Sequence, residues 1–153
     1  MKEKFMSRIN FKFICLIAML CTITIGITAC QKSIDKKNLT SNQKNVLKAA
    51  NYYKEVYNKH NKYAMKSMIS DEAEILIGTG QDKRYVSKSE YLSKFPERWK
   101  KYPKFKNKFY KIEMLGDNEA KVKTYIMINS NRINIDWIFN KNNGKWILAG
   151  YDY

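Results

Sequence analysis

Residues 120–153 read AKVKTYIMINSNRINIDWIFNKNNGKWILAGYDY, and this stretch decides the fold because apolar and polar residues alternate along most of it. A period of two is the pattern of a strand with one buried face. Asn143-Gly144 is a strong short-range signal for a two-residue hairpin turn. With the segment before Gly116, the pattern predicts a four-stranded antiparallel meander at residues 105–115, 120–129, 133–140 and 145–153.

The alternation also assigns the two faces of this meander. One parity is expected to face the helices and comprises Val122, Thr124, Ile126, Ile128, Ile133, Ile135, Trp137 and Phe139. The opposite parity comprises Tyr125, Met127, Ile138, Ile147 and Tyr151. Because this second face is mixed rather than polar, it is a candidate surface for a homodimer or for an envelope protein partner.

The residues before the meander predict a helical hairpin. Apolar residues recur at spacings of three and four from Val46 to His60, which is the stripe of an amphipathic helix that ends near Lys59. Asn61 has a side chain suited to capping a second helix. The apolar stripe of that short helix comprises Ala64, Met65, Met68 and Ile69.

A short strand pair and a third helix connect this hairpin to the meander. Residues 73–78 and 84–86 predict the two strands, with turn-forming residues between them. Ser87 or Ser89 can cap the third helix, and its apolar residues are Tyr91, Leu92 and Phe95. Pro96 is tolerated only in the first turn of a helix, so it can split this segment into two short helices, the second with Trp99.

This order of elements resembles the cone-shaped fold of the nuclear transport factor 2-like and SnoaL-like proteins, a cystatin-like fold. Tyr52–Asn58 is similar to the first helix of those proteins, and Lys145–Tyr151 is similar to their closing strand. The resemblance covers residues 46–153. It implies an α+β fold in which three N-terminal helices pack on a curved, mainly antiparallel sheet around a conical cavity. Some members bind small molecules there, and isomerases and dehydratases among them place an acid inside.

The first thirty residues predict export and lipidation. A basic start is followed by an apolar run from Phe13 to Ala29, which is the order of an export signal. Ile27-Thr28-Ala29-Cys30 resembles the lipobox of bacterial lipoproteins, which implies cleavage before Cys30 and a lipid on its sulfur. The expected parts are a signal peptide at 1–29, a flexible tether at 30–45 and a domain at 46–153. The alternative is an uncleaved transmembrane anchor; both place the domain outside the cytoplasm.

Charge and cysteine content agree with an exported protein. The chain has 29 Lys and Arg against 14 Asp and Glu. Loss of residues 1–29 removes four bases and one acid, which leaves 25 bases, 13 acids and a net charge of +12. Such a domain favours anionic lipid or wall polymer over nucleic acid, although AT-rich coding sequence also produces many lysines. Cys30 would be the one cysteine left, so no disulfide, metal site or cofactor is expected.

The run from Lys100 to Lys108 is the candidate contact for an anionic surface. It interleaves bases with aromatic rings, and its lysines are Lys100, Lys101, Lys104, Lys106 and Lys108. Lysine supplies charge and the rings supply interfacial contact at a lipid headgroup layer. A solvated sheet edge protected by lysine is the alternative interpretation.

Aromatic residues are the candidate lining of a ligand pocket. They are Tyr52, Tyr53, Trp99, Trp137, Phe139 and Trp146, and core packing is the alternative interpretation. No catalytic residue is assigned. His60 is expected to pack at a helix end or to be partly exposed there, and Asp136 is expected to point away from the cavity. Asp152 and Glu74 could reach the cavity mouth, but exposure to solvent is the favoured interpretation of both.

The sequence therefore favours a non-enzymatic lipoprotein on the extracytoplasmic face of the cell membrane, which binds a small apolar ligand or a protein partner. The first alternative is an enzyme of the isomerase or dehydratase type that uses Asp152, Glu74 or Asp136. The second is an interaction subunit of an envelope complex.

Overall fold

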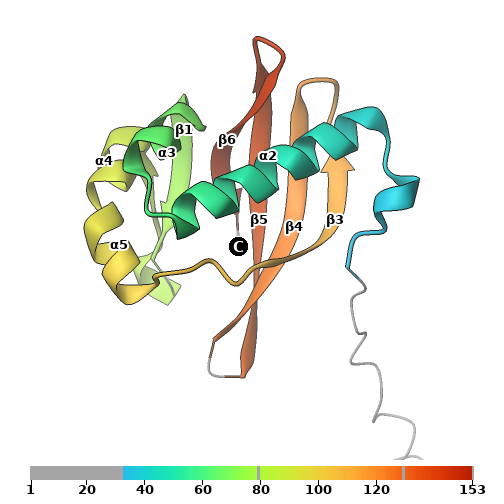
Figure 1. Ribbon diagram of the computed structural model, residues 1–153. Coiled ribbons are helices and arrows are strands. Elements are labelled where there is room, and N and C mark those ends of the chain that lie inside the picture. The colour runs from blue at the N-terminus through green and yellow to red at the C-terminus, as the bar shows by residue number, and fades with distance from the viewer. Residues whose placement is uncertain (1–32, 79, 129, 153) are drawn as a thin grey trace, which may run out of the picture. The chain divides into compact units, whose positions relative to one another are not determined.

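Six strands form one curved sheet, and α2 lies across one of its faces (Figure 1). The computed structural model describes residues 33–78, 80–128 and 130–152, so the expected export signal and Cys30 lie outside the described residues. The helices are η1 (Lys36–Asn38), α2 (Ser41–Asn58), α3 (Lys62–Ser67), η2 (Gly80–Asp82), α4 (Lys88–Ser93) and α5 (Phe95–Lys101). The strands are β1 (Ile69–Ile77), β2 (Arg84–Ser87), β3 (Lys108–Met114), β4 (Glu119–Ile128), β5 (Asn131–Asn142) and β6 (Lys145–Asp152).

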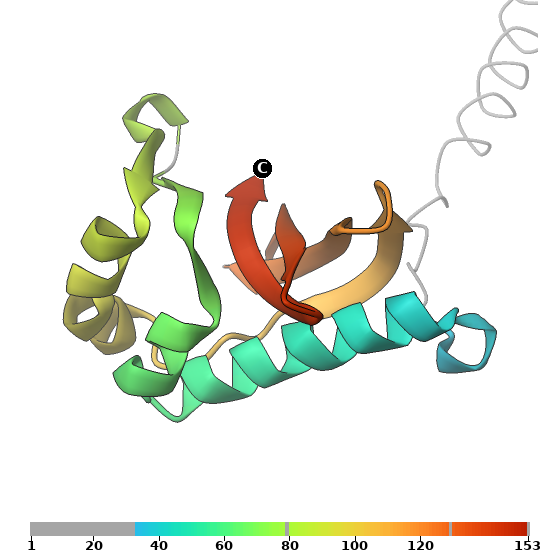
Figure 2. The same cartoon turned by 90° about the horizontal axis from the view of Figure 1, so that it is seen from above.

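The order of the strands is β2-β1-β6-β5-β4-β3. All neighbouring strands are antiparallel except β1 and β6, which are parallel. Viewed from above, β3 to β6 curve over α2 (Figure 2). In the same view β1 and β2 lie with α4 and α5 near the C-terminal end of α2. The expected α+β class with a curved, mainly antiparallel sheet is confirmed, and the parallel β1–β6 pair makes the sheet mixed.

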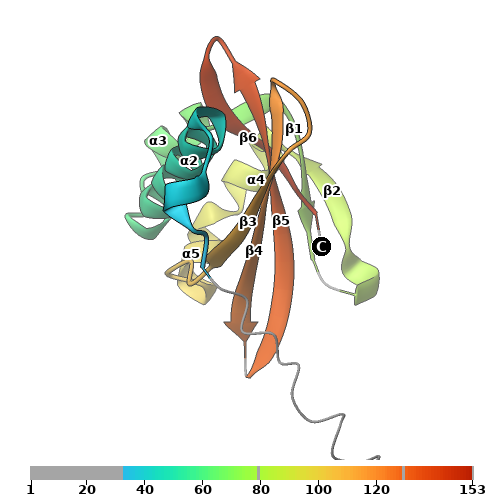
Figure 3. The ribbon, with the colours of Figure 1, turned by 90° about the vertical axis from the view of Figure 1, so that its right-hand side faces the viewer.

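The predicted hairpin turn and most of the predicted sheet faces are confirmed. Asn143 and Gly144 have φ of 48° and 77°, as a two-residue turn with two left-handed positions requires. The inward parity is buried at Val122, Thr124 and Trp137. Figure 3 shows α2 and α3 on one side of β3, β4 and β5, which is the side that these residues face.

A bulge at Ala149 overturns part of the prediction for the last strand. Phe139 pairs with Leu148 but Ile138 pairs with Gly150, so Ala149 is an extra residue in β6. One extra residue reverses every side chain beyond it. Tyr151, expected on the outer face, is therefore buried at 5% exposure, and Asp152 turns outward.

The split that Pro96 allows is present, and one helix boundary differs from the prediction. Pro96 lies in the first turn of α5, so the third predicted segment forms two short helices, α4 and α5, the second with Trp99, and the three expected helices are four α-helices in the described residues. Thr40 and Gln43 form a capping box that starts α2 at Ser41. Residues 41–45, assigned to the tether, are thus helical. Because their side chains are all polar, the apolar periodicity that predicts a helix is absent from these residues.

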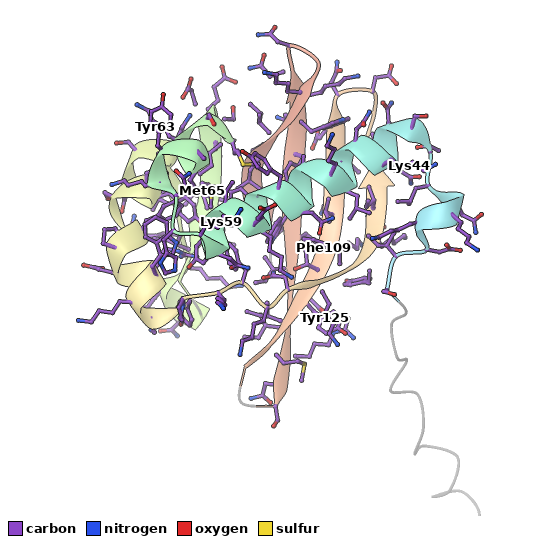
Figure 4. All side chains as sticks on the ribbon, viewed as in Figure 1. Lys44, Lys59, Tyr63, Met65, Phe109 and Tyr125 are labelled. Carbon is purple, nitrogen blue, oxygen red and sulfur yellow. The ribbon has the colours of Figure 1, made fainter. Side chains whose placement is uncertain are left out.

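The core lies between α2 and the sheet. Its largest fully buried side chains include Trp137, Tyr53, Tyr57, Tyr91 and Phe95. Figure 4 shows Tyr63, 89% exposed, extending away from this core. In the described part of the chain, no helix combines the length and the hydropathy needed to cross a membrane.

Candidate functional site

A cavity of about 660 Å³ opens on the α2 side of the sheet. One wall is the connection from α5 to β3, residues 102–107, which we call the strap; it runs beside α2 in Figure 1. The opposite wall is the far end of β4 and β5. The apolar lining residues are Pro103, Phe105, Ile126, Met127, Ile133, Ile135 and Trp137, and Gly78 also lines the cavity. The polar and charged lining residues are Tyr57, Arg98, Lys101, Tyr102, Lys104, Lys106, Asn107 and Tyr151.

The strap is held in place by the C-terminal half of α2. The Tyr57 hydroxyl donates to the carbonyl of Tyr102 at 2.9 Å, and Asn58 Oδ1 accepts from the amide of Phe105 at 2.6 Å. The Phe105 ring stacks on Tyr57 with ring centroids 3.8 Å apart. Lys54 Nζ donates to the carbonyl of Asn107 at 2.7 Å. A segment without regular backbone pairing thereby becomes a defined cavity wall.

His60 supports the same strap from the end of α2. Its Nε2 lies 2.9 Å from the carbonyl oxygen of Pro103, and its ring stacks on Trp99 with centroids 4.9 Å apart. A neutral ring with the proton on Nε2 makes this bond, and so does a charged ring. The expectation that His60 packs at a helix end is confirmed.

Three tyrosine hydroxyls meet behind the cavity, and we call Tyr53, Tyr91 and Tyr151 the tyrosine triad. Tyr151 donates to Tyr53 at 2.6 Å, and Tyr91 lies 3.2 Å from Tyr53 and 3.1 Å from Tyr151. If each hydroxyl donates one hydrogen bond and accepts one, the three hydrogen bonds form a closed cycle and every hydroxyl proton has an acceptor. Burial raises the pKa of Tyr53 and of Tyr151 well above the ordinary value of 10.0, so both stay neutral.

Arg98 is the cation nearest to this triad. Its guanidinium carbon lies 5.0 Å from the centroid of the Tyr91 ring. The side chain is half-buried, and its Nε is enclosed without a hydrogen-bond acceptor. Among the described residues no carboxylate forms a salt bridge with Arg98. The guanidinium is protonated at any physiological pH, so the cavity wall carries a positive charge.

Asn107 supplies a second unpartnered polar atom. It is 3% exposed, and its Nδ2 donates to Thr124 Oγ1 at 2.9 Å while Oδ1 has no partner. Whichever way the amide is turned, one of its two polar atoms bonds to Thr124 and the other does not. A buried amide atom of this kind calls for a partner from water or from a ligand.

Three of the six predicted pocket aromatics have rings in contact, because Trp137 lies 5.2 Å from Tyr53 and 6.4 Å from Phe139 by ring centroids. Of these six, Trp137 lines the cavity, with its ring 5.6 Å from Phe105 by centroids. Tyr53 lies behind it in the triad, and Trp99 packs against His60. Phe139 and Trp146 are buried in the core, and neither lines the cavity. Tyr52 is 51% exposed on the outside of α2, because it lies off the buried stripe that runs through Ala50, Tyr53 and Tyr57.

The three candidate acids lie outside the cavity lining. Asp136 and Asp152 both reach Lys121, each at 3.5 Å, on the outer face of the sheet. The alternation correctly places Asp136 there. Asp152 is exposed, as its favoured interpretation expected, and the bulge at Ala149 removes the alternative in which it reaches the cavity mouth. Glu74 is exposed on β1. In the described part of the chain, no three His, Cys, Asp or Glu side chains cluster as a metal site needs.

The candidate lysines divide between rim and surface. Lys101, Lys104 and Lys106 line the cavity and are exposed, so they form a basic rim. Lys100 and Lys108 are exposed to either side of them. Sequence reasoning missed Arg98, Tyr57, Tyr151 and Asn107. For Arg98 a signal exists, because it follows Tyr91 by seven residues and Phe95 by three, which places it on the inward side of the helices.

Comparisons with known proteins identify the fold. No family model and no curated protein matches the chain. An NTF2-like protein of unknown function from Methylobacillus flagellatus is similar in structure, with a TM-score of 0.57, 13% identity, and coverage of 74% of this chain and 92% of that one. A second such protein, from Shewanella baltica, has a TM-score of 0.55 at 18% identity, over 74% and 94%.

A ketosteroid isomerase-like protein from Erwinia carotovora atroseptica has a TM-score of 0.54 at 15% identity, over 74% of this chain and 95% of that one. These identities establish the fold alone. The chain has the nuclear transport factor 2-like, or cystatin-like, fold that the resemblance implied.

Proposed function

We propose that this chain is a membrane-anchored extracytoplasmic lipoprotein whose domain binds a small, mainly apolar molecule in the cavity beside the strap. The observation that carries the proposal is the cavity itself. Its volume of about 660 Å³ lies within the range of about 300–1,000 Å³ of small-molecule sites. Its walls combine aliphatic and aromatic side chains with a few polar groups, which is the usual composition of such sites.

Two unpartnered polar atoms support a ligand rather than a solvent-filled gap of no function. More than about 90% of buried polar groups in proteins have a hydrogen-bond partner. Three side-chain atoms in the described residues have none, and two of them, Arg98 Nε and one amide atom of Asn107, belong to residues that line this cavity, whereas the third, Trp99 Nε1, does not. Because these atoms are enclosed, a bound molecule with matching polar atoms would supply their partners only after a small shift of the two side chains.

The membrane location is supported by residues outside the described part of the chain. Ile27-Thr28-Ala29-Cys30 has the residue types of a lipobox. The basic run from Lys100 to Lys108 contributes Lys101, Lys104 and Lys106 to one wall of the cavity, and we propose that the run lies on anionic headgroups or wall polymer. A ligand taken from the membrane would then enter by the side that faces it.

An enzymatic function receives less support. Isomerase-like proteins share the fold, but function depends on the site rather than on the fold. The acids that the sequence offered, Asp136, Asp152 and Glu74, do not line the cavity. General acid–base chemistry needs a proton donor or acceptor within reach of the substrate.

The test is native mass spectrometry of the protein taken from its own membranes, with two matched variants. Ile126→Trp fills the cavity, while Ile138→Trp puts the same ring on the outer face of the neighbouring strand. We expect wild type and Ile138→Trp to retain a bound small molecule and Ile126→Trp to lose it. The proposal would be refuted by a wild-type protein that carries no small molecule and binds none of three added probes, namely decanoate, decyl phosphate and decanol.

A further inference from the structure

Arg98 is a half-buried cation inside a largely apolar cavity. Its Nε has no acceptor, its guanidinium faces the Tyr91 ring, and no described carboxylate pairs with it. Buried charges in proteins are normally paired, because an isolated charge loses its hydration without compensation. Stacking of the guanidinium on one aromatic ring compensates only part of the lost hydration free energy. Arg98 is therefore the lining group that a partner of opposite charge would stabilise most.

We propose that the molecule bound in this cavity is an anionic amphiphile, with an apolar body and one acidic head that pairs with Arg98. This inference rests on the proposed ligand-binding function and specifies the class of ligand. A carboxylate or a phosphate monoester fits the guanidinium in the same manner, through paired hydrogen bonds to two oxygens. A wholly apolar ligand would strip water from Arg98 and leave the charge unpaired.

The neighbouring hydroxyls do not compete for the acidic head. The triad hydroxyls bond to one another, and the Tyr57 hydroxyl donates to the carbonyl of Tyr102. Burial raises the pKa of Tyr57, and both the positive charge of Arg98 and a hydrogen bond from Arg98 to the Tyr57 hydroxyl oppose that rise. This hydrogen bond compensates part of the lost hydration of Arg98 but brings no negative charge to it. The charge-assisted donors at this wall are therefore those of Arg98.

The rest of the cavity suits the remainder of such a molecule. Ile126, Ile133, Ile135 and Trp137 offer an apolar wall for its body. No acid lines the cavity, so nothing in the described lining repels an anion. Lys101, Lys104 and Lys106 line the same wall of the cavity and attract an anion over several ångströms. Because these lysines are exposed, salt screens their attraction far more than it screens that of Arg98.

The experiment uses decanoate, decyl phosphate and decanol, which share one apolar chain and differ in the head. Binding to the full domain, residues 30–153 with Cys30→Ser, is measured by isothermal titration calorimetry at physiological salt. We expect decanoate or decyl phosphate to bind at least about tenfold more tightly than decanol, as expected of a charge-assisted pair. The two acids distinguish a carboxylate ligand from a phosphate ligand.

Three variants separate Arg98 from the rim. Arg98→Met keeps an unbranched apolar side chain and should make the affinities for acid and alcohol equal. Arg98→Lys keeps the charge and should retain part of the preference. Lys101→Met should leave the preference in place and reduce only its salt dependence. A thermal melt by circular dichroism verifies that each variant folds, and decanol binding verifies that its cavity is intact.

The outcomes are distinct. If the wild type binds acid and alcohol equally, or if Arg98→Met keeps the preference, the anionic class is wrong while a small-ligand site stands. If none of the three probes binds the wild type and no small molecule co-purifies, the proposed function itself is wrong. Loss of the preference in Arg98→Met with decanol binding retained supports the inference.

Discussion

At the scale of single residues, the tyrosine triad shows how this core accommodates polar groups. Tyr53, Tyr91 and Tyr151 come from α2, α4 and β6, and each hydroxyl finds its partners in the other two. An isolated buried hydroxyl costs stability, whereas a closed ring of three satisfies all of them. The triad therefore ties two helices to the last strand.

The triad predicts a characteristic response to alkaline pH. Burial raises the pKa of Tyr53 and Tyr151 well above 10.0, so above that pH the unfolded chain loses protons that the folded protein keeps. The stabilisation is complete below pH 10 and is lost as pH rises beyond it. Each tyrosine should lower the free energy of unfolding by about 1.4 kcal/mol per pH unit.

Urea titrations above pH 10 check this prediction with Tyr151→Phe. The variant should lose about 1–3 kcal/mol at neutral pH, because its partners lose hydrogen bonds. Its stability should also fall less steeply at alkaline pH than that of the wild type. Tyr63→Phe, at an 89% exposed position, leaves the triad intact and serves as the control. Equal alkaline slopes for wild type and Tyr151→Phe would contradict the role of burial.

At the scale of elements, the last strand decides where the cavity residues lie. The bulge at Ala149 turns Tyr151 inward to the triad and Asp152 outward to Lys121. Just beyond it, Gly150 pairs with Glu74 of β1. A Cβ at Gly150 would stand 2.6 Å from the carbonyl oxygen of Glu74, which is closer than atoms in contact allow. Glycine thus permits the close parallel pairing of β1 and β6.

Gly150→Ala is expected to weaken this pairing. Because the clash is with backbone rather than with a flexible side chain, the strands must separate, and overpacking of this kind costs about 1–3 kcal/mol. Chemical denaturation measures the loss. Lys145→Ala, at an exposed position of the same strand, should change stability by less than about 0.5 kcal/mol. A Gly150→Ala protein as stable as the control would show that β1 and β6 are not in such close contact.

At the scale of the whole molecule, we propose that a lipid anchor and the basic domain both contribute to binding at the membrane. One sequence feature, Ile27-Thr28-Ala29-Cys30, carries the lipoprotein proposal, and a basic rim lies along one wall of the cavity. A lipid on Cys30 would hold the domain at the bilayer, where lysine charges add attraction to anionic headgroups. An anionic amphiphile from the same membrane would be within reach of the cavity.

Cys30→Ser tests the anchor. Without the cysteine there is no site for the lipid and no lipobox for cleavage, so the variant should keep residues 1–29 and carry no lipid. Membrane fractionation with mass determination of the product distinguishes the outcomes. Wild-type protein that is uncleaved and unlipidated in the membrane, with Cys30→Ser identical to it, would favour a transmembrane anchor instead.

Local pattern alone determined much of this fold. Strand positions, the Asn143-Gly144 turn and the inward parity of β4 and β5 follow from a period of two and from turn chemistry, which neighbouring residues set. Helix caps at Asn61 and Ser87 follow from side chains that bond to amides three residues away. These interactions join residues that are close in the sequence, so local sequence patterns predict them.

The composition of the cavity was decided by tertiary structure. Tyr151 faces inward because of one extra residue in β6, and the strap becomes a wall because Tyr57 and Asn58 bind it across 45 and 47 residues of chain. The role proposed for Arg98 depends on its surroundings, which are the Tyr91 ring, an apolar wall and a described lining without acids. Burial and pairing between distant segments set these properties, and no pattern of adjacent residues encodes them.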